Sequence, residues 1–241
     1  MPISIDLSAR RVFLTLVVII IALVTASTIA GAAWYFLDLG ESGFLMVQLF
    51  WIDSELNIPT WYSTVTLLAS ALLLGLIAKM RRRDGDPYST HWTVMAFIFV
   101  FLALDEGAQI HERMVGPVRW VLERSPLPSS TFLEVGPAWV VLGALFVLVF
   151  VFIFLKFLLH LPARIRNLMV LSGAIFVTGA LGFEILSHSH AVVHGQENAV
   201  YALLATVEET LEMLGIALFI YTLLLHISTI APRFQLTIRN R

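Results

Sequence analysis

Six apolar stretches of about 20 residues or more constrain the fold of this chain more than any other feature of its sequence. An α-helix of about 20 residues is long enough to cross a hydrocarbon core roughly 30 Å thick. Transmembrane strands need only about ten residues and alternate in hydrophobicity, which these stretches do not. The sequence therefore predicts an all-α integral membrane protein, a six-transmembrane-helix bundle. We expect one membrane domain over residues 1–241, with spans at about 12–36, 60–80, 91–111, 137–160, 166–188 and 199–228.

Composition supports this class. Hydrophobic residues make up 59% of the chain and charged residues 13%, which is typical of a membrane protein, and no basic patch indicates a nucleic-acid partner. The chain has no cysteine, which excludes disulfides, thiolate ligands and thioether-attached haem. Arg10 and Arg11 precede the first apolar stretch as in a signal peptide, but the stretch is longer than a cleaved hydrophobic region. We therefore expect a retained span.

The basic residues predict an orientation. In a six-span arrangement, most of them fall on one side, and by the positive-inside rule that side is the cytoplasm. These residues are Arg10, Arg11, Lys79, Arg81, Arg82, Arg83, Lys156, Arg164, Arg166, Arg233, Arg239 and Arg241. Only Arg113, Arg119 and Arg124 fall on the other side. We expect the protein in the inner (plasma) membrane of a bacterial cell, with both termini in the cytoplasm. The acidic residues then lie toward the periplasmic or external face.

Two outer loops, residues 38–59 and 112–136, are longer than a turn. The first contains an apolar segment too short to span a membrane, and we expect a re-entrant or interface-lying helix there. The second contains MVGPVRWVLER, whose apolar and basic residues partition as in a surface helix, and we expect an interfacial helix there as well.

Ionisable residues occur in the outer halves of three predicted spans. The third span ends in LDEGAQIHE with Asp105, His111 and Glu112, the fifth in FEILSHSH with Glu184 and His188, and the sixth contains VEETLE with Glu208, Glu209 and Glu212. An unpaired charge in a span costs at least about 2.5–3.5 kcal/mol, so such residues indicate function. Apart from Arg166 at the inner end of the fifth span, no Lys or Arg lies within these spans to neutralise the acids. Protons or a bound cation must therefore compensate the charge.

Helical spacing favours a shared cation site. Glu208 and Glu212 are four residues apart and project from one helix face, as do Glu184 and His188. Asp105 and Glu112 are seven residues apart and also share a face, together with Ala108 and Gln109. Carboxylates and imidazoles that converge from several helices suit a divalent metal such as iron, zinc or manganese. We expect one or two ions held by Asp105, His111, Glu112, Glu184, His188, Glu208 and Glu212, with Gln109 orienting ligands and Glu209 as a general acid or base.

This inventory of ligands resembles that of the di-iron and di-manganese carboxylate bundles, in ligand chemistry alone. Their Glu-x-x-His signature is absent, since Ala108 follows Asp105 by three residues and Gln109 follows Glu106 by three. The resemblance implies a dinuclear site, whereas the missing signature leaves the number of ions open.

The predicted function is that of a membrane metalloprotein, an oxidoreductase or hydrolase that acts on a lipophilic small molecule at the outer side of the lipid bilayer. One alternative is a transporter of divalent cations or protons. Another is a non-catalytic subunit that binds partner membrane subunits in a larger complex. A network of protonated carboxyls, or a haem between His111 and His188, would explain the same residues less completely.

Overall fold

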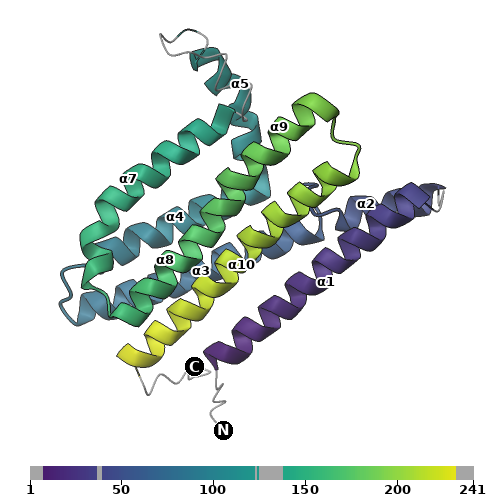
Figure 1. Cartoon of the computed structure of the whole chain (residues 1–241). Helices are drawn as coiled ribbons and strands as arrows, with labels where there is room; N and C mark the ends of the chain where they lie inside the picture. The colour runs from purple at the N-terminus through teal and green to yellow at the C-terminus, as the bar shows by residue number, and fades with distance from the viewer. Residues whose placement is uncertain (1–7, 37–39, 123, 125–137, 232–241) are drawn as a thin grey trace, which may run out of the picture.

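The computed structural model describes residues 8–36, 40–122, 124 and 138–231, and no β-strand occurs in these ranges (Figure 1). The helices are α1 (Ala9–Phe36), α2 (Gly40–Phe50), α3 (Ile58–Arg83), α4 (Ser89–Ala108), α5 (Ile110–Leu122), α7 (Ala138–His160), α8 (Ala163–Val177), the π-helix η1 (Thr178–Phe183), α9 (Glu184–His194) and α10 (Ala199–Ile230). Residues 125–136 of the second predicted outer loop lie outside the described part of the chain.

In the part of the chain that is described, six helices are long and apolar enough to cross a membrane, which confirms the all-helical class and the expected number of helices able to span. They are Ala9–Trp34, Ile58–Arg83, Ser89–Ala108, Trp139–His160, Ala163–His194 and Ala199–Ile230. The fifth combines α8, η1 and α9 in one span. Short helices also lie in the two loops predicted at the outer side, α2 in the first and α5 in the second.

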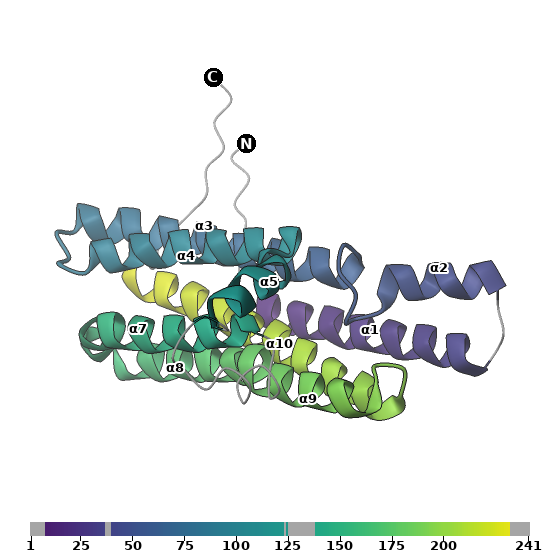
Figure 2. The same cartoon turned by 90° about the horizontal axis from the view of Figure 1, so that it is seen from above.

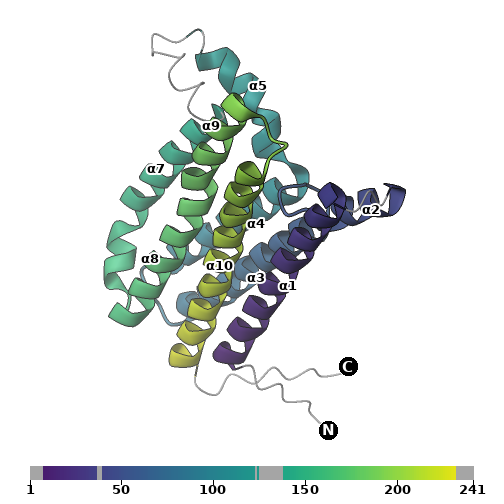
Figure 3. The same ribbon diagram turned by 45° about the vertical axis from the view of Figure 1, so that its right-hand side comes forward.

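The ends of the spans divide between two ends of the bundle. The start of α1, the end of α10 and the turns from α3 to α4 and from α7 to α8 lie at one end (Figure 1). Helices α2 and α5 and the turn from α9 to α10 lie at the other end (Figure 3). We call the second end the α2–α5 end.

Helix α10 is the centre of the bundle. It runs between the α3–α4 pair and the helices α7 to α9 (Figure 2), and it contacts α1, α3, α8, η1 and α9. In the most apolar 18-residue segment of α10, 56% of the residues are buried, whereas the corresponding share is 17% in α1, α4 and α7. Outward-facing side chains such as Leu72, Phe97 and Phe152 are 77%, 71% and 86% exposed. So much exposed apolar surface is typical of helices that face lipid.

Helix boundaries follow from local capping. Asn57 caps α3 by accepting a hydrogen bond from the Thr60 N–H at 3.1 Å, and Pro59 occupies the first turn, where no N–H is needed. Asn198 caps α10 in the same way, accepting from the Tyr201 N–H at 3.0 Å. These caps fix the two helices at the α2–α5 end.

The third span ends earlier than a continuous helix would. Helix α4 stops at Ala108 because Gln109 adopts a left-handed conformation, with φ of 55°, and α5 begins at Ile110. The expectation that Asp105 and Glu112 share one helix face is therefore wrong. The two residues belong to different helices, and the change of direction between them places α5 over the end of the bundle.

Candidate metal site and acidic cavity

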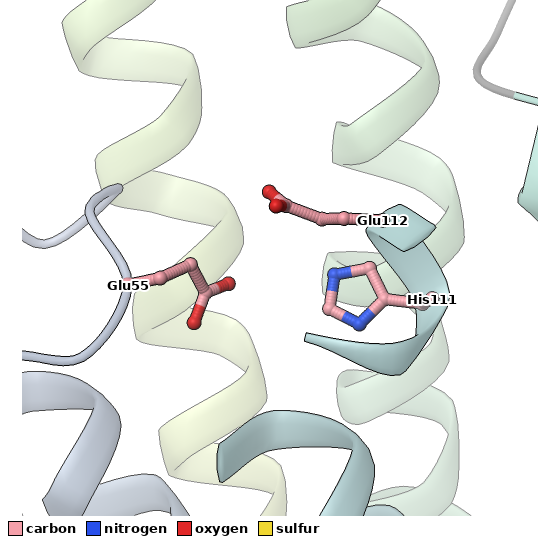
Figure 4. Close-up of side chains that lie close together, drawn as sticks. All are labelled: Glu55, His111 and Glu112. Atoms are coloured by element: carbon pink, nitrogen blue, oxygen red, sulfur yellow. The ribbon is translucent and has the colours of Figure 1, made fainter. Parts of the chain in front are cut away.

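Three side chains at the α2–α5 end converge. Glu55 from the loop between α2 and α3, and His111 and Glu112 from the start of α5, each place one ligand atom within 4.8 Å of the others (Figure 4). Figure 4 shows both carboxylates and the imidazole turned toward the same space. Two carboxylate oxygens and an imidazole nitrogen form a donor set for a borderline divalent metal. We call these three residues the triad.

The break after α4 orients His111. Asp105, in the last turn of α4, accepts a hydrogen bond from the His111 backbone N–H through Oδ1 at 2.8 Å. Its Oδ2 lies 3.2 Å from His111 Nδ1. Because a carboxylate only accepts hydrogen bonds, Nδ1 carries a proton and Nε2 is left to act as the ligand. The Trp139 ring, with its centroid 5.2 Å from that of His111, packs against the imidazole.

The loop that carries Glu55 is held by hydrogen bonds at several points. Its Ile52 N–H donates to Ser27 Oγ of α1 at 3.0 Å, and Asn57 Nδ2 donates to the Trp51 carbonyl at 2.6 Å. Leu56, directly after Glu55, has a φ of 60°, a conformation that L-residues other than Asn and Asp rarely adopt. The loop thus fixes the direction of the Glu55 side chain at some cost in backbone strain.

The loop and the start of α5 concentrate negative charge. Burial raises the pKa of Glu55 to about 7, and Glu112, Asp105 and Asp53 add to this effect while His111 opposes it. Glu55 Oε2 is buried without a hydrogen-bond partner among the described residues. Burial opposes protonation of His111, but the hydrogen bond and charge of Asp105 outweigh it and raise the pKa of His111. An orphaned oxygen beside an oriented imidazole fits a bound cation.

A cavity of about 530 Å³ adjoins the triad, with Glu112 in its wall. Helix α9 also contributes to the wall, through Glu184, Ser187 and His188. Asp53 and Tyr201 also line it, and the Tyr201 hydroxyl donates to Asp53 Oδ2 at 3.0 Å. Desolvation is the main reason that the pKa of Asp53 rises to about 6, although part of its side-chain surface is exposed.

The π-helix η1 sets the position of the α9 residues. Its wider turn accommodates an extra residue, so it changes the register of Glu184 and the residues that follow. Gly179 in η1 lies against α10: a Cβ at this position would lie 2.8 Å from the Glu208 carbonyl oxygen and 2.9 Å from Glu212 Cγ. Glycine therefore allows η1 and α10 to touch beside the acids.

The predicted site residues occupy three places. His111 and Glu112 are in the triad, and Asp105 orients His111 rather than joining them. Glu184 and His188 line the cavity. Glu208 is buried below it and accepts a hydrogen bond from Ser187 Oγ at 2.9 Å. Glu212, against Gly179, is farther along α10.

The remaining acids of α10 interact with α4. Glu209 and Glu212 interact electrostatically with Glu106. Glu209 is not among the described residues that line the cavity. Glu55 was missed by the sequence reasoning because its segment, IDSELNIP, has no helical period that would place it relative to α5. The only local signal was a carboxylate next to the capping pair Asn57 and Pro59.

The fold and the site together define a class: an all-α protein with six helices able to cross a membrane and a carboxylate–histidine cluster beside an acidic cavity at one end of the bundle. The chain belongs to the family described as Domain of unknown function (DUF8692), which it matches over residues 12–227. No curated protein and no solved structure matches it.

Proposed function

We propose that this protein is an integral membrane metalloenzyme that binds a divalent ion, iron, zinc or manganese, through Glu55, His111 and Glu112. The observation that carries the proposal is the triad, whose ligand atoms lie within 4.8 Å of one another. Three protein ligands leave coordination positions for water or substrate, as in catalytic sites, whereas structural zinc sites use four. Glu112 also lines the cavity, so the open positions would face it.

The α9 residues that line the cavity complete the proposed chemistry. A divalent ion at the triad would activate water if it is zinc, or support oxygen chemistry if it is iron, so hydrolase and oxidoreductase activities both remain within the proposal. Glu184 and His188 line the same cavity as Glu112 and are placed to exchange a proton with a bound molecule. In this proposal they take the acid–base role first assigned to Glu209.

The proposed substrate is an amphiphile whose polar end enters the cavity at the outer side of the membrane. The orientation is supported by the basic residues, most of which lie at the opposite end of the bundle from the triad. Among the described residues, Trp34 and Val47 give the cavity an apolar edge, whereas most of its wall is polar. An entirely apolar molecule would leave those polar groups without partners.

Transport of cations or protons is less well supported. Between Glu212 and His226, helix α10 buries Ile216, Phe219, Ile220 and Leu223 in two apolar clusters with α3 and α4. The buried Thr222 hydroxyl donates to its own helix at the Leu218 carbonyl, 2.8 Å away. An apolar layer at this depth obstructs a polar path from the acids to the other end of the bundle.

Elemental analysis of protein purified in detergent without chelator tests the metal site. We expect about one divalent ion per chain in the wild type, and loss of that ion in Glu55→Gln and His111→Ala, because each substitution removes one of three ligands. Glu212→Gln should keep the ion, since Glu212 lies outside the triad. Asp84→Asn, an exposed residue at the opposite end, is the matched control.

Each result has a defined meaning. A wild type free of metal would refute the proposal. Loss of metal in Glu212→Gln with retention in Glu55→Gln would indicate that the metal binds at the acids of α10 instead of the triad. Bound metal without turnover of any amphiphile would favour a non-catalytic subunit.

A further inference from the structure

Four acidic side chains line the cavity beside the triad. Its carboxylates are Asp53, Glu112, Glu184 and Glu197, which come from the α2–α3 loop, α5, α9 and the α9–α10 turn. No Lys or Arg is found among the described residues that line it. A divalent ion at the triad would compensate Glu112, at one edge. The acids on the other walls then have no Lys or Arg beside them among the described lining residues, and His188 is the one basic side chain there.

The size of the cavity favours a molecule over a bare ion. At about 530 Å³ it lies within the range of roughly 300–1,000 Å³ that ligand pockets occupy. Most of that volume exceeds what one metal ion with its waters would fill. An organic molecule with a positive charge at one end would fill this volume and compensate the acids of the wall.

Aromatic side chains line the same cavity. Trp34 from α1, Trp51 at the start of the α2–α3 loop and Tyr201 from α10 contribute to its wall. Trp51 packs tightly on α1: a Cβ at Gly31 would lie 2.5 Å from its ring. Tyr201 is held by its hydrogen bond to Asp53 at 3.0 Å. Aromatic faces combined with carboxylates are the surroundings in which proteins bind organic ammonium groups.

We propose that the cavity recognises an ammonium group on the substrate, with Asp53 and Glu197 supplying charge and Trp34 and Trp51 supplying aromatic faces. This inference rests on the proposed function, because it names the chemistry of the substrate's polar end next to the metal. A small soluble amine and the head group of a lipid present the same ammonium chemistry. Both would place that group in the cavity beside the triad.

Isothermal titration calorimetry on the full chain in a sugar-based detergent tests the inference. The probes are choline and 3,3-dimethylbutan-1-ol, a neutral molecule of the same shape. We expect choline to bind at least about tenfold more tightly, because only its charge interacts with the carboxylates and aromatic faces. Asp53→Asn/Glu197→Gln should weaken choline binding at least about tenfold, and Trp34→Leu should weaken it several-fold. Asp84→Asn, at the other end of the bundle, should not change it.

A second arm separates the two sources of the ammonium group. The protein is placed in nanodiscs of phosphatidylglycerol, with or without a fraction of phosphatidylcholine. Binding of free choline is then compared between the two, to measure competition by the lipid. Competition indicates that a lipid head group occupies the cavity, whereas unchanged choline binding indicates a soluble amine, and both support an ammonium site. Equal affinity for choline and its neutral analogue, or full affinity in the double variant, would overturn the inference.

Metal content and melting temperature are measured on the same samples. Stoichiometric metal without selective choline binding would leave the proposed metal site standing and refute the ammonium site. Selective choline binding without metal would refute the proposed function and leave only a cation-binding cavity. A melting temperature equal to that of the wild type shows that the double variant is folded.

Discussion

At the scale of single residues, Asp105 links the backbone to the site. One of its oxygens accepts from the first turn of α5 and the other from the His111 ring, so one side chain sets both the direction of the helix and the tautomer of the ligand. Glu55 meets His111 from a separate loop, with one oxygen buried and unpartnered. The site thus combines a carboxylate whose two oxygens both accept hydrogen bonds with one that has a buried oxygen without a partner among the described residues.

Asp105→Asn should lower metal affinity about 10- to 100-fold, the usual effect of losing a carboxylate that supports a histidine ligand. Asparagine keeps an oxygen for the His111 backbone N–H, but the amide nitrogen that replaces the second oxygen is a donor and cannot accept from the ring. Competition with a metal-sensitive dye measures the affinity. Affinity equal to that of the wild type, in a variant that melts at the same temperature, would show that Asp105 does not support the ligand.

Metal binding should strengthen as the pH rises. The pKa of Glu55 is raised to about 7 and that of His111 is also raised, so both hold protons that a metal must displace. We expect the affinity to increase by up to about tenfold per pH unit for each displaced proton below these pKa values. Dye competition between about pH 5.5 and pH 8 measures the trend. Affinity that is independent of pH would contradict it.

The same shifts predict the stability of the metal-free protein. Because both folded-state pKa values are raised, the folded state binds protons more tightly than the unfolded state, and this stabilisation is lost as the pH rises through about 7. The melting temperature of the apoprotein in detergent should therefore fall between about pH 5.5 and pH 8. Added metal should restore it more at the higher pH. Glu55→Gln should show a smaller fall than the wild type.

At the scale of elements, close contact between η1, α8 and α10 positions the acids. Gly179 faces Glu208 and Glu212, and at Gly215 of α10 a Cβ would lie 2.8 Å from the Phe176 backbone nitrogen of α8. Small residues let transmembrane helices approach in this way. The contact fixes how far Glu184 and Ser187, which follow η1, lie from Glu208.

Gly179→Ala should destabilise the protein by about 1–3 kcal/mol, because the added methyl group meets backbone atoms of α10 that cannot move independently. Gly173→Ala is the matched control. It lies on the neighbouring helix α8, with no atom within 4 Å of the added Cβ, and should leave the protein as stable or slightly more stable. Denaturant titration in detergent measures both. Equal stability of the two variants would argue against the contact.

At the scale of the whole molecule, six spans place the triad and the cavity at one end of the bundle. The start of α1 and the end of α10 lie at the other end (Figure 1), where most of the basic residues also lie. Helix α10 connects the two ends, with acids in its first half and buried apolar side chains beyond them. This asymmetry suits a protein whose chemistry faces one side of a membrane.

Cysteine labelling tests the proposed orientation without background, because the chain has no native cysteine. Arg124→Cys, at the α2–α5 end, should react with a membrane-impermeant maleimide in intact spheroplasts. Asp84→Cys, in the α3–α4 turn, should react only after the membrane is permeabilised. Both side chains are exposed, so accessibility to solvent does not differ between them. The reverse labelling pattern would contradict the proposed orientation and would indicate that the site faces the cytoplasm.

The fold class followed from the sequence because hydrophobicity over about 20 residues is a local property. The six helices could be predicted from the length of each apolar stretch alone. The similar depth of the ionisable residues could be predicted from the rise per residue along each helix. Glu184 and His188 could be grouped from spacing alone, since η1 ends before Glu184 and both lie in α9. The sequence by itself thus determined the number of helices able to cross a membrane and the presence of acidic residues in three of them.

Only the tertiary structure decided which side chains meet. The left-handed turn at Gln109 separated Asp105 from Glu112, and the hydrogen-bonded loop after α2 brought Glu55 to His111. Both depend on contacts between segments distant in the chain, which periodicity along one helix does not contain. Glu208 and Glu212 share a face of α10, as their spacing requires, yet that face lies against η1 and α9 instead of the triad. The physical reason is that spacing fixes the direction of a side chain around its own helix, whereas packing fixes what lies in that direction.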